Sequence, residues 1–84
     1  RAQAVLRRWH QAVGPLLGEK TVPERFEHGT VWVAASGSAW AQELRLARET
    51  VLRRLNEMAG ERLFEDLRVG TRVPRADLRE GHEA

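Results

Sequence analysis

The amino-acid sequence predicts one α+β domain in which two helices cover one face of a three-stranded sheet, in the chain order α-β-β-α-β. Two stretches, residues 2–17 and 39–59, repeat their apolar residues at three- and four-residue steps, as amphipathic helices do. Between them, residues 30–35 are rich in β-branched and aromatic side chains, which favour a strand. The 84 residues leave room for a single core, so we expect one domain.

The first predicted helix is amphipathic from Val5 to Leu16, with its arginines and His10 on the side opposite the apolar residues. Proline lacks a backbone donor and restricts the residue before it, so Gly14-Pro15 should end this helix near Gly14. The chain can re-form a short turn over residues 15–18.

A β-hairpin is predicted next. Glu24 to His28 forms its first strand, His28-Gly29 supplies the turn, and residues 30–35 form its second strand. Because strand side chains alternate, Val31 and Val33 face the core while Trp32 points to the other side of the sheet. That other side is left for solvent or for a partner.

The second predicted helix is the longest element. Ser36-Gly37-Ser38 offers hydroxyl groups to cap its first amides, and residues 39–59 contain neither proline nor glycine. Its apolar residues keep a 3.6-residue period over about five turns. Gly60 is placed to close it with a left-handed cap.

The third predicted strand is residues 63–69, with Leu67 and Val69 as the inward positions. Residues 72–84 contain proline and many charges, and we expect them to form a disordered tail. The predicted boundaries are therefore a folded domain over residues 1–71 and a charged tail over residues 72–84.

Composition bounds the class of protein. There is no cysteine, hence no disulfide and no thiolate metal site, as is usual for a cytoplasmic protein. Apolar runs are too short to span a membrane, and no targeting segment opens the chain, so we expect a cytoplasmic, nucleoid-associated protein without membrane contact.

Fourteen basic and twelve acidic groups give a net charge of +2. This small positive excess can attract either phosphates or an acidic protein partner. The sequence does not start with Met, so we expect a fragment.

The sequence lacks the residue sets that an enzyme needs. His10, His28 and His82 lack the paired spacing of a zinc site, and no glycine-rich segment ends in the Gly-Lys-Ser/Thr of a phosphate-binding loop. Glu65 and Asp66 are adjacent on a predicted strand and face opposite ways, which argues against a catalytic pair. We expect no catalytic residues, no metal and no cofactor.

The tryptophans and arginines are the candidate contact residues. Trp9 and Trp40 lie on apolar helix stripes and are predicted to be core residues. Trp32 has two open interpretations: a partner-binding or base-stacking aromatic, or a side chain packed under a loop or the tail. Six arginines can contact phosphates or a partner, with a solvated helix surface as the simpler alternative: Arg7, Arg8, Arg45, Arg48, Arg53 and Arg54. Helix spacing groups Arg45 with Arg48.

Several runs of residues together resemble one protein family. They lie in order on the predicted elements: Trp9-His10-Gln11-Ala12-Val13-Gly14-Pro15-Leu16-Leu17, Gly29-Thr30-Val31-Trp32-Val33, Ser38-Ala39-Trp40-Ala41-Gln42-Glu43-Leu44, Leu52-Arg53-Arg54-Leu55-Asn56 and Leu67-Arg68-Val69-Gly70. This set resembles the DciA family of loaders of the bacterial replicative helicase, DnaB. The resemblance covers residues 5–70.

The resemblance implies a KH-like domain that binds the DnaB-type helicase, helps to load it on DNA when replication starts, and contacts single-stranded or duplex DNA weakly and without sequence specificity. It implies no covalent chemistry, and we expect a monomer in isolation. The chain lacks the Gly-x-x-Gly loop with which KH domains hold a nucleic-acid backbone, so any DNA contact must use another surface. The alternative function is a general binding module for single-stranded DNA or RNA.

Overall fold

A computed structural model describes residues 1–71 as one α+β domain, and the predicted tail at residues 72–84 lies outside the described residues. The elements, in chain order, are α1 (Ala2–Leu6), α2 (Trp9–Val13), α3 (Pro15–Lys20), β1 (Thr21–Glu27), β2 (Thr30–Ala35), α4 (Ser38–Leu46), α5 (Arg48–Ala59) and β3 (Asp66–Thr71). The predicted fold class is confirmed. The predicted number of helices is not, because each of the two expected helices is divided.

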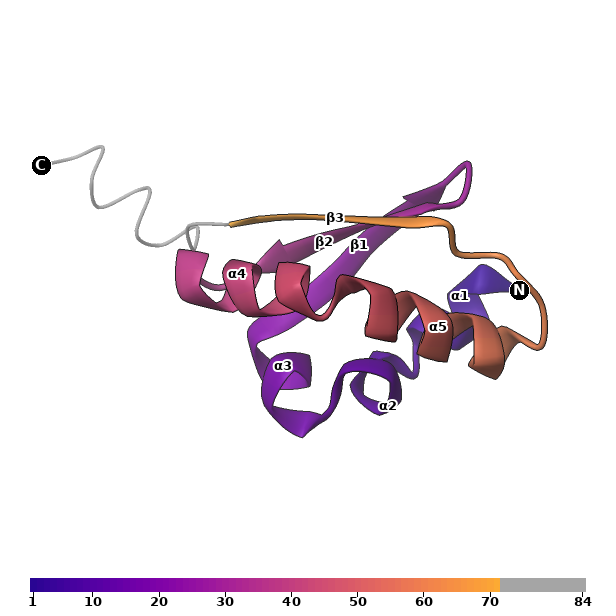
Figure 1. Ribbon diagram of the computed structural model, residues 1–84, viewed down its shortest axis with the longest axis horizontal. Helices are drawn as coiled ribbons and strands as arrows, with labels where there is room; N and C mark the ends of the chain where they lie inside the picture. The colour runs from indigo at the N-terminus through magenta and orange to yellow at the C-terminus, as the bar shows by residue number, and fades with distance from the viewer. Residues whose placement is uncertain (72–84) are drawn as a thin grey trace, which may run out of the picture.

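The three strands form one sheet in the order β1-β2-β3, so β2 is the central strand. β1 and β2 form an antiparallel hairpin, whereas β2 and β3 run parallel. Parallel neighbours need a long crossover, and here α4 and α5 provide it. Figure 1 shows the helices gathered on one side of this sheet.

The first helical region is three short helices instead of one. The chain bends at Arg8, whose φ of −104° and ψ of 35° are not helical and whose amide bonds to the carbonyl of Val5. This break lets both α1 and α2 contact α5. No proline or glycine marks it, so the apolar period could not reveal it. The boundary at Gly14 is confirmed, since Gly14 has a φ of +91° and α3 starts at Pro15.

The hairpin is confirmed, but β1 starts three residues earlier than predicted. The turn uses left-handed backbone at His28 (φ 50°) and Gly29 (φ 81°), which matches the twist of a two-residue hairpin loop. The register shifts between Pro23 and Arg25. Proline cannot donate to a strand ladder, and β1 is an edge strand, where a missing donor and an irregular register are tolerated. Glu24 therefore lies at a bulge.

The predicted long helix is interrupted at Ala47, where the backbone turns to φ −92° and ψ 7°. The Ala47 amide is shared between the carbonyls of Glu43 and Leu44, both at 3.1 Å, so the chain bends without leaving the helical path. The bend separates α4, which packs on β2 and β3, from α5, which contacts α1, α2 and β3. Gly60 closes α5 with a φ of +76°, as predicted.

The third strand starts later than predicted, at Asp66. Residues 63–65 instead lead into it, and Phe64 is buried in the core with 1% exposure. Asn56 holds this segment with two side-chain bonds: its Nδ2 donates to the carbonyl of Phe64 at 2.9 Å, and its Oδ1 accepts from the Phe64 amide at 2.8 Å. The inward positions are confirmed, because Leu67 is buried and Val69 packs against the core.

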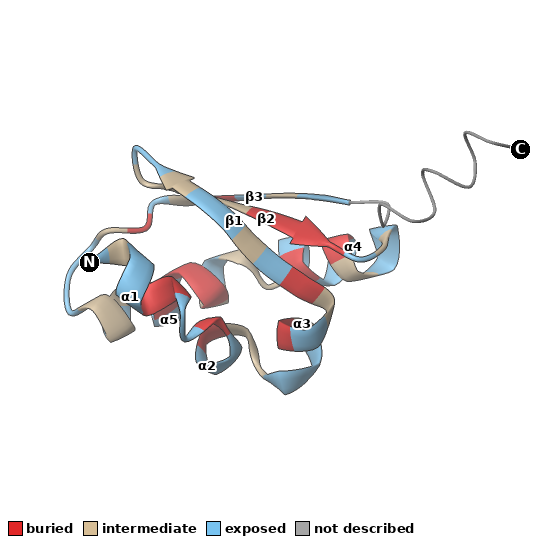
Figure 2. Cartoon of the chain, turned by 180° about the vertical axis from the view of Figure 1, so that it is seen from behind, coloured by how far each residue is buried: buried red, intermediate tan, exposed pale blue. Residues whose placement is uncertain are grey.

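The core lies between the helices and one face of the sheet, as the buried residues in Figure 2 show. Trp9 is 3% exposed, and its indole N–H donates to the hydroxyl of Thr21 at 2.9 Å. Thr21 in turn donates to the carbonyl of Leu17 at 2.6 Å. These bonds join α2, α3 and β1 and satisfy the buried polar groups of this corner.

Trp40 corrects the prediction of a core residue. It is half-buried and lies outside the buried cluster, with the ammonium group of Lys20 over its ring at 5.8 Å from the centroid. Its position near the start of α4 explains this, because the buried residues of that helix are Ala41 and Leu44. Only the first of the two tryptophans therefore belongs to the core.

Candidate binding surface

One row of side chains crosses the sheet face that the described helices leave uncovered. The register pairs Trp32 on β2 with Arg25 on β1 and with Arg68 on β3. The guanidinium carbons lie 4.8 Å (Arg25) and 5.8 Å (Arg68) from the centroid of the Trp32 ring, within the range of cation–π contacts. The prediction that Trp32 points away from the two valines is confirmed: Val31 and Val33 are buried, whereas Trp32 is half-buried. We call this set the Arg-Trp-Arg row.

Each arginine of the row has a carboxylate two residues away on its own strand. Arg25 lies 3.8 Å from Glu27, and Arg68 lies 3.2 Å from Asp66. Both carboxylates stand on the side of the row that faces the hairpin turn. On the other side, the register places Ala34 and Gly70, so that side of the row has small side chains and no charge on β2 and β3.

Asp66 accepts hydrogen bonds on both of its carboxylate oxygens. Its Oδ1 accepts from Nε of Arg48 at 3.0 Å, from Nη2 of the same residue at 2.6 Å, and from the Leu67 amide at 2.8 Å. Its Oδ2 accepts from Nε of Arg68 at 3.2 Å. The bonds from Arg48, then Arg68, then the Leu67 amide lower the pKa of Asp66 to about 2. The group is ionised at neutral pH and cannot serve as a general acid there.

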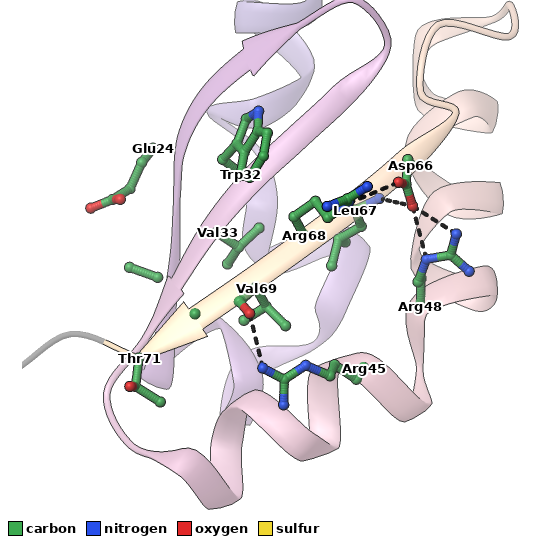
Figure 3. A pocket seen from close by; sticks show the side chains of 12 residues that line it. Glu24, Trp32, Val33, Arg45, Arg48, Asp66, Leu67, Arg68, Val69 and Thr71 are labelled. Atoms are coloured by element: carbon green, nitrogen blue, oxygen red, sulfur yellow. Dashed lines mark hydrogen bonds and ion pairs between the residues drawn. The ribbon is translucent and has the colours of Figure 1, made fainter.

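Arg45 and Arg48 lie together beside β3, as helix spacing predicted (Figure 3). Nη2 of Arg45 donates to the carbonyl of Val69 at 3.0 Å, and Arg48 makes the ion pair with Asp66. Both arginines thus fasten the bend between α4 and α5 to the outer strand. Together with Trp32, Arg68 and Gly70 they line a shallow groove along β3.

The other four arginines named from the sequence lie on the helices, away from this groove. Arg54 donates to the carbonyl of Ala12 at 3.3 Å, and Arg8 donates to the side chain of Gln11 at 2.9 Å, so both lie beside α2. Arg7 and Arg53 are exposed and make no side-chain bond within residues 1–71. The structure therefore does not bring the six arginines together in one patch.

Sequence reasoning missed Arg25 and Arg68, which flank Trp32 in the structure. Arg25 lies in none of the runs that carry the family resemblance, and Arg68 lies in one of them but was not named as a contact residue. The two are 43 positions apart, the difference of their residue numbers. The signal exists only once the strand register is known, because cross-strand neighbours are set by pairing and not by sequence distance. Period-two alternation does place Arg68 on the face opposite Leu67, which is the face of Trp32. It does not show that the two side chains are neighbours.

The described part of the chain carries no cluster that suggests metal or membrane binding. Within residues 1–71, no group of three or more His, Asp or Glu side chains could hold a metal ion. Among the helices of the same residues, none is long and apolar enough to cross a membrane. What the uncovered sheet face offers is charge and the aromatic ring of Trp32.

By fold and surface, the chain is a small α+β domain with an uncovered sheet face and arginines beside its outer strand. Its family follows from sequence comparison. The family model described as "Dna[CI] antecedent, DciA" matches residues 1–69, and the chain therefore belongs to the DciA family. The predicted family resemblance is confirmed.

Curated relatives agree with this assignment. The chain is 26% identical over 66 residues to a UPF0232 protein of Mycolicibacterium smegmatis, covering 79% of this chain and 34% of that protein. It is 31% identical over 65 residues to a UPF0232 protein of Rhodococcus jostii (77% and 35%). It is 38% identical over 58 residues to one of Streptomyces avermitilis (67% and 32%). The matched region spans about a third of each relative's length.

Proposed function

We propose that this domain is a non-enzymatic replication factor that binds the bacterial replicative helicase of the DnaB type and promotes its loading on DNA. The observation that carries the proposal is the family match over residues 1–69, which covers almost all of the described domain. Family membership fits a role beside that helicase in the cytoplasm, at the nucleoid. The helicase would supply ATP hydrolysis, and this domain would supply a binding surface.

The structure supports a binding role through its surface chemistry. Trp and Arg are the residue types that most often dominate the energy of protein interfaces, and the Arg-Trp-Arg row presents both on one sheet face. Arg45 and Arg48 extend the same groove around the outer strand. Since Asp66 is held ionised between arginines, the polar part of this surface is organised before a partner arrives.

A general single-stranded DNA- or RNA-binding module is the second candidate function. The observation that favours it is the second arginine group, Arg8 and Arg54 beside α2, with the exposed Arg7 and Arg53 on the same helical layer. Each phosphate that these side chains neutralise would steepen the salt dependence of binding by about one unit, without base specificity. A steep salt dependence together with no helicase association would favour this candidate.

The test is a pull-down from lysate of the source organism with this domain as bait, with and without exhaustive nuclease treatment. Helicase captured after nuclease treatment supports direct binding. Helicase that is absent, or that disappears with nuclease, contradicts the proposal and favours the nucleic-acid module. A bait carrying Phe64→Asp, which places a charge in the core, controls for capture by an unfolded chain.

A further inference from the structure

The uncovered sheet face has an uneven distribution of charge around Trp32. On the side of the hairpin turn, Glu27 and Asp66 already occupy the two arginines of the row. On the opposite side, Ala34 and Gly70 form a low floor next to the indole ring. A Cβ built on Gly70 would meet nothing within 4 Å, so space stands open above this position.

We propose that this floor is the docking position of an acidic protein segment, which places an apolar side chain against Trp32 and carboxylates against Arg25 and Arg68. The indole holds both guanidinium groups over its ring, one from each neighbouring strand. Ala34 and Gly70 are the next residues of β2 and β3 on the same face, so the floor adjoins both guanidinium groups. A carboxylate that arrives over Ala34 and Gly70 meets both arginines from the side that Glu27 and Asp66 leave open.

The charges of this face favour a protein over a nucleic acid. A nucleic-acid strand needs a continuous basic stripe along its phosphates. Here each arginine of the row has its own carboxylate, and Glu24 lines the same groove, so the arginines do not form a continuous basic stripe. With Arg45 and Arg48, the arginines of this surface still outnumber its carboxylates, which favours an acidic partner. Charges of both signs around one large aromatic side chain are typical of a protein interface, where complementary charges set the register and the aromatic ring carries the affinity.

This inference rests on the proposed function, because the partner used to test it is the helicase. The structure offers a substitution that should block the floor without harming the fold. Gly70 lies in a strand, its φ is not in the left-handed region, and its Cβ direction is free. Gly70→Val therefore adds a β-branched side chain that suits a strand and fills the floor. Gly70→Ala is a graded companion that fills it less.

The experiment measures the affinity of the purified domain for the purified DnaB-type helicase of the same organism, in the absence of nucleic acid. Gly70→Val and the double variant Arg25→Glu/Arg68→Glu should each weaken binding at least tenfold, and Gly70→Ala should weaken it less. Arg62→Glu is the matched charge reversal on the exposed loop between α5 and β3 and should stay within twofold of wild type. Thermal unfolding of each variant checks the fold, and Gly70→Val should melt no lower than wild type.

Three results would overturn the inference, and they differ from one another. If wild type binds helicase and all variants bind equally well, the docking position lies elsewhere and the proposed function stands. If wild type does not bind helicase, the proposed function fails and this inference fails with it. If a fluorescent oligodeoxythymidylate binds wild type and loses affinity in Gly70→Val, the occupant of the floor is nucleic acid and not an acidic protein segment.

Discussion

Asn56 gives the sharpest test of how the outer strand is held in place. Its side-chain amide makes two hydrogen bonds to the backbone of Phe64, in the segment that leads into β3. Asn56→Ala removes both partners and leaves one amide and one carbonyl of a buried residue unsatisfied. A lost bond of this kind costs about 1–1.5 kcal/mol, so we expect a loss of about 2–3 kcal/mol from a total stability on the order of 5–10 kcal/mol.

Asn56→Asp separates the two bonds. The carboxylate can still accept from the Phe64 amide, but it cannot donate to the Phe64 carbonyl, and its charge lies near the negative end of α5. At pH 7 this variant should be at least as unstable as Asn56→Ala. Its native pKa is expected to be raised, because only the protonated acid can donate. The deficit should therefore shrink as the pH falls and grow as it rises.

Urea unfolding at pH 7 and pH 4.5, followed by circular dichroism, measures these differences. Glu57→Ala is the matched control, since Glu57 is the exposed neighbour on the same helix and should change stability by less than about 0.5 kcal/mol. The reasoning would be refuted if Asn56→Asp were as stable as wild type at pH 7, or if its deficit were the same at both pH values.

Three further outcomes follow from the same structure. Thr21→Val should cost about 1–3 kcal/mol because it leaves the indole N–H of Trp9 and the carbonyl of Leu17 without their partner, and Thr21→Ser should recover part of this in a thermal melt. Asp66 has a native pKa of about 2, below its unfolded value, so its contribution is complete above about pH 4 and is lost as the pH falls toward 2. After allowance for solvent exposure this contribution is about 1 kcal/mol, and acid titration of wild type against Asp66→Asn should show it; parallel acid curves would contradict it. Gly60→Ala should cost about 1 kcal/mol in urea, because Gly60 has a φ of +76°, and an unchanged midpoint would count against the left-handed cap.

The sequence predicted the parts of the fold that depend on local pattern. The inward valines of β2, the Gly14 boundary, the glycine cap of α5 and the inward positions of β3 were all available from periodicity and from the special conformations of proline and glycine. The bends at Arg8 and Ala47 were not, because neither site has a residue that breaks helices. The helices on either side of each bend contact elements distant in sequence, and no local pattern records such contacts.

Part of the candidate surface could likewise be predicted from local pattern, and part of it could not. Alternation was enough to place Trp32 on the uncovered face, and helix spacing was enough to group Arg45 with Arg48. The partners of Trp32 required the register of three strands, so Arg25 and Arg68 stayed unrecognised. Trp40 was predicted to be buried because it continues an apolar stripe, but the stripe begins to pack one residue later, at Ala41.

The most direct test of the proposed function is to mix this purified domain with the purified DnaB-type helicase of the same organism, free of nucleic acid, and to measure complex formation by sedimentation velocity. The proposal predicts that the domain moves with the helicase ring, and that the Asn56→Ala domain does so less at temperatures where it is partly unfolded. Two species that sediment independently at all concentrations would contradict it.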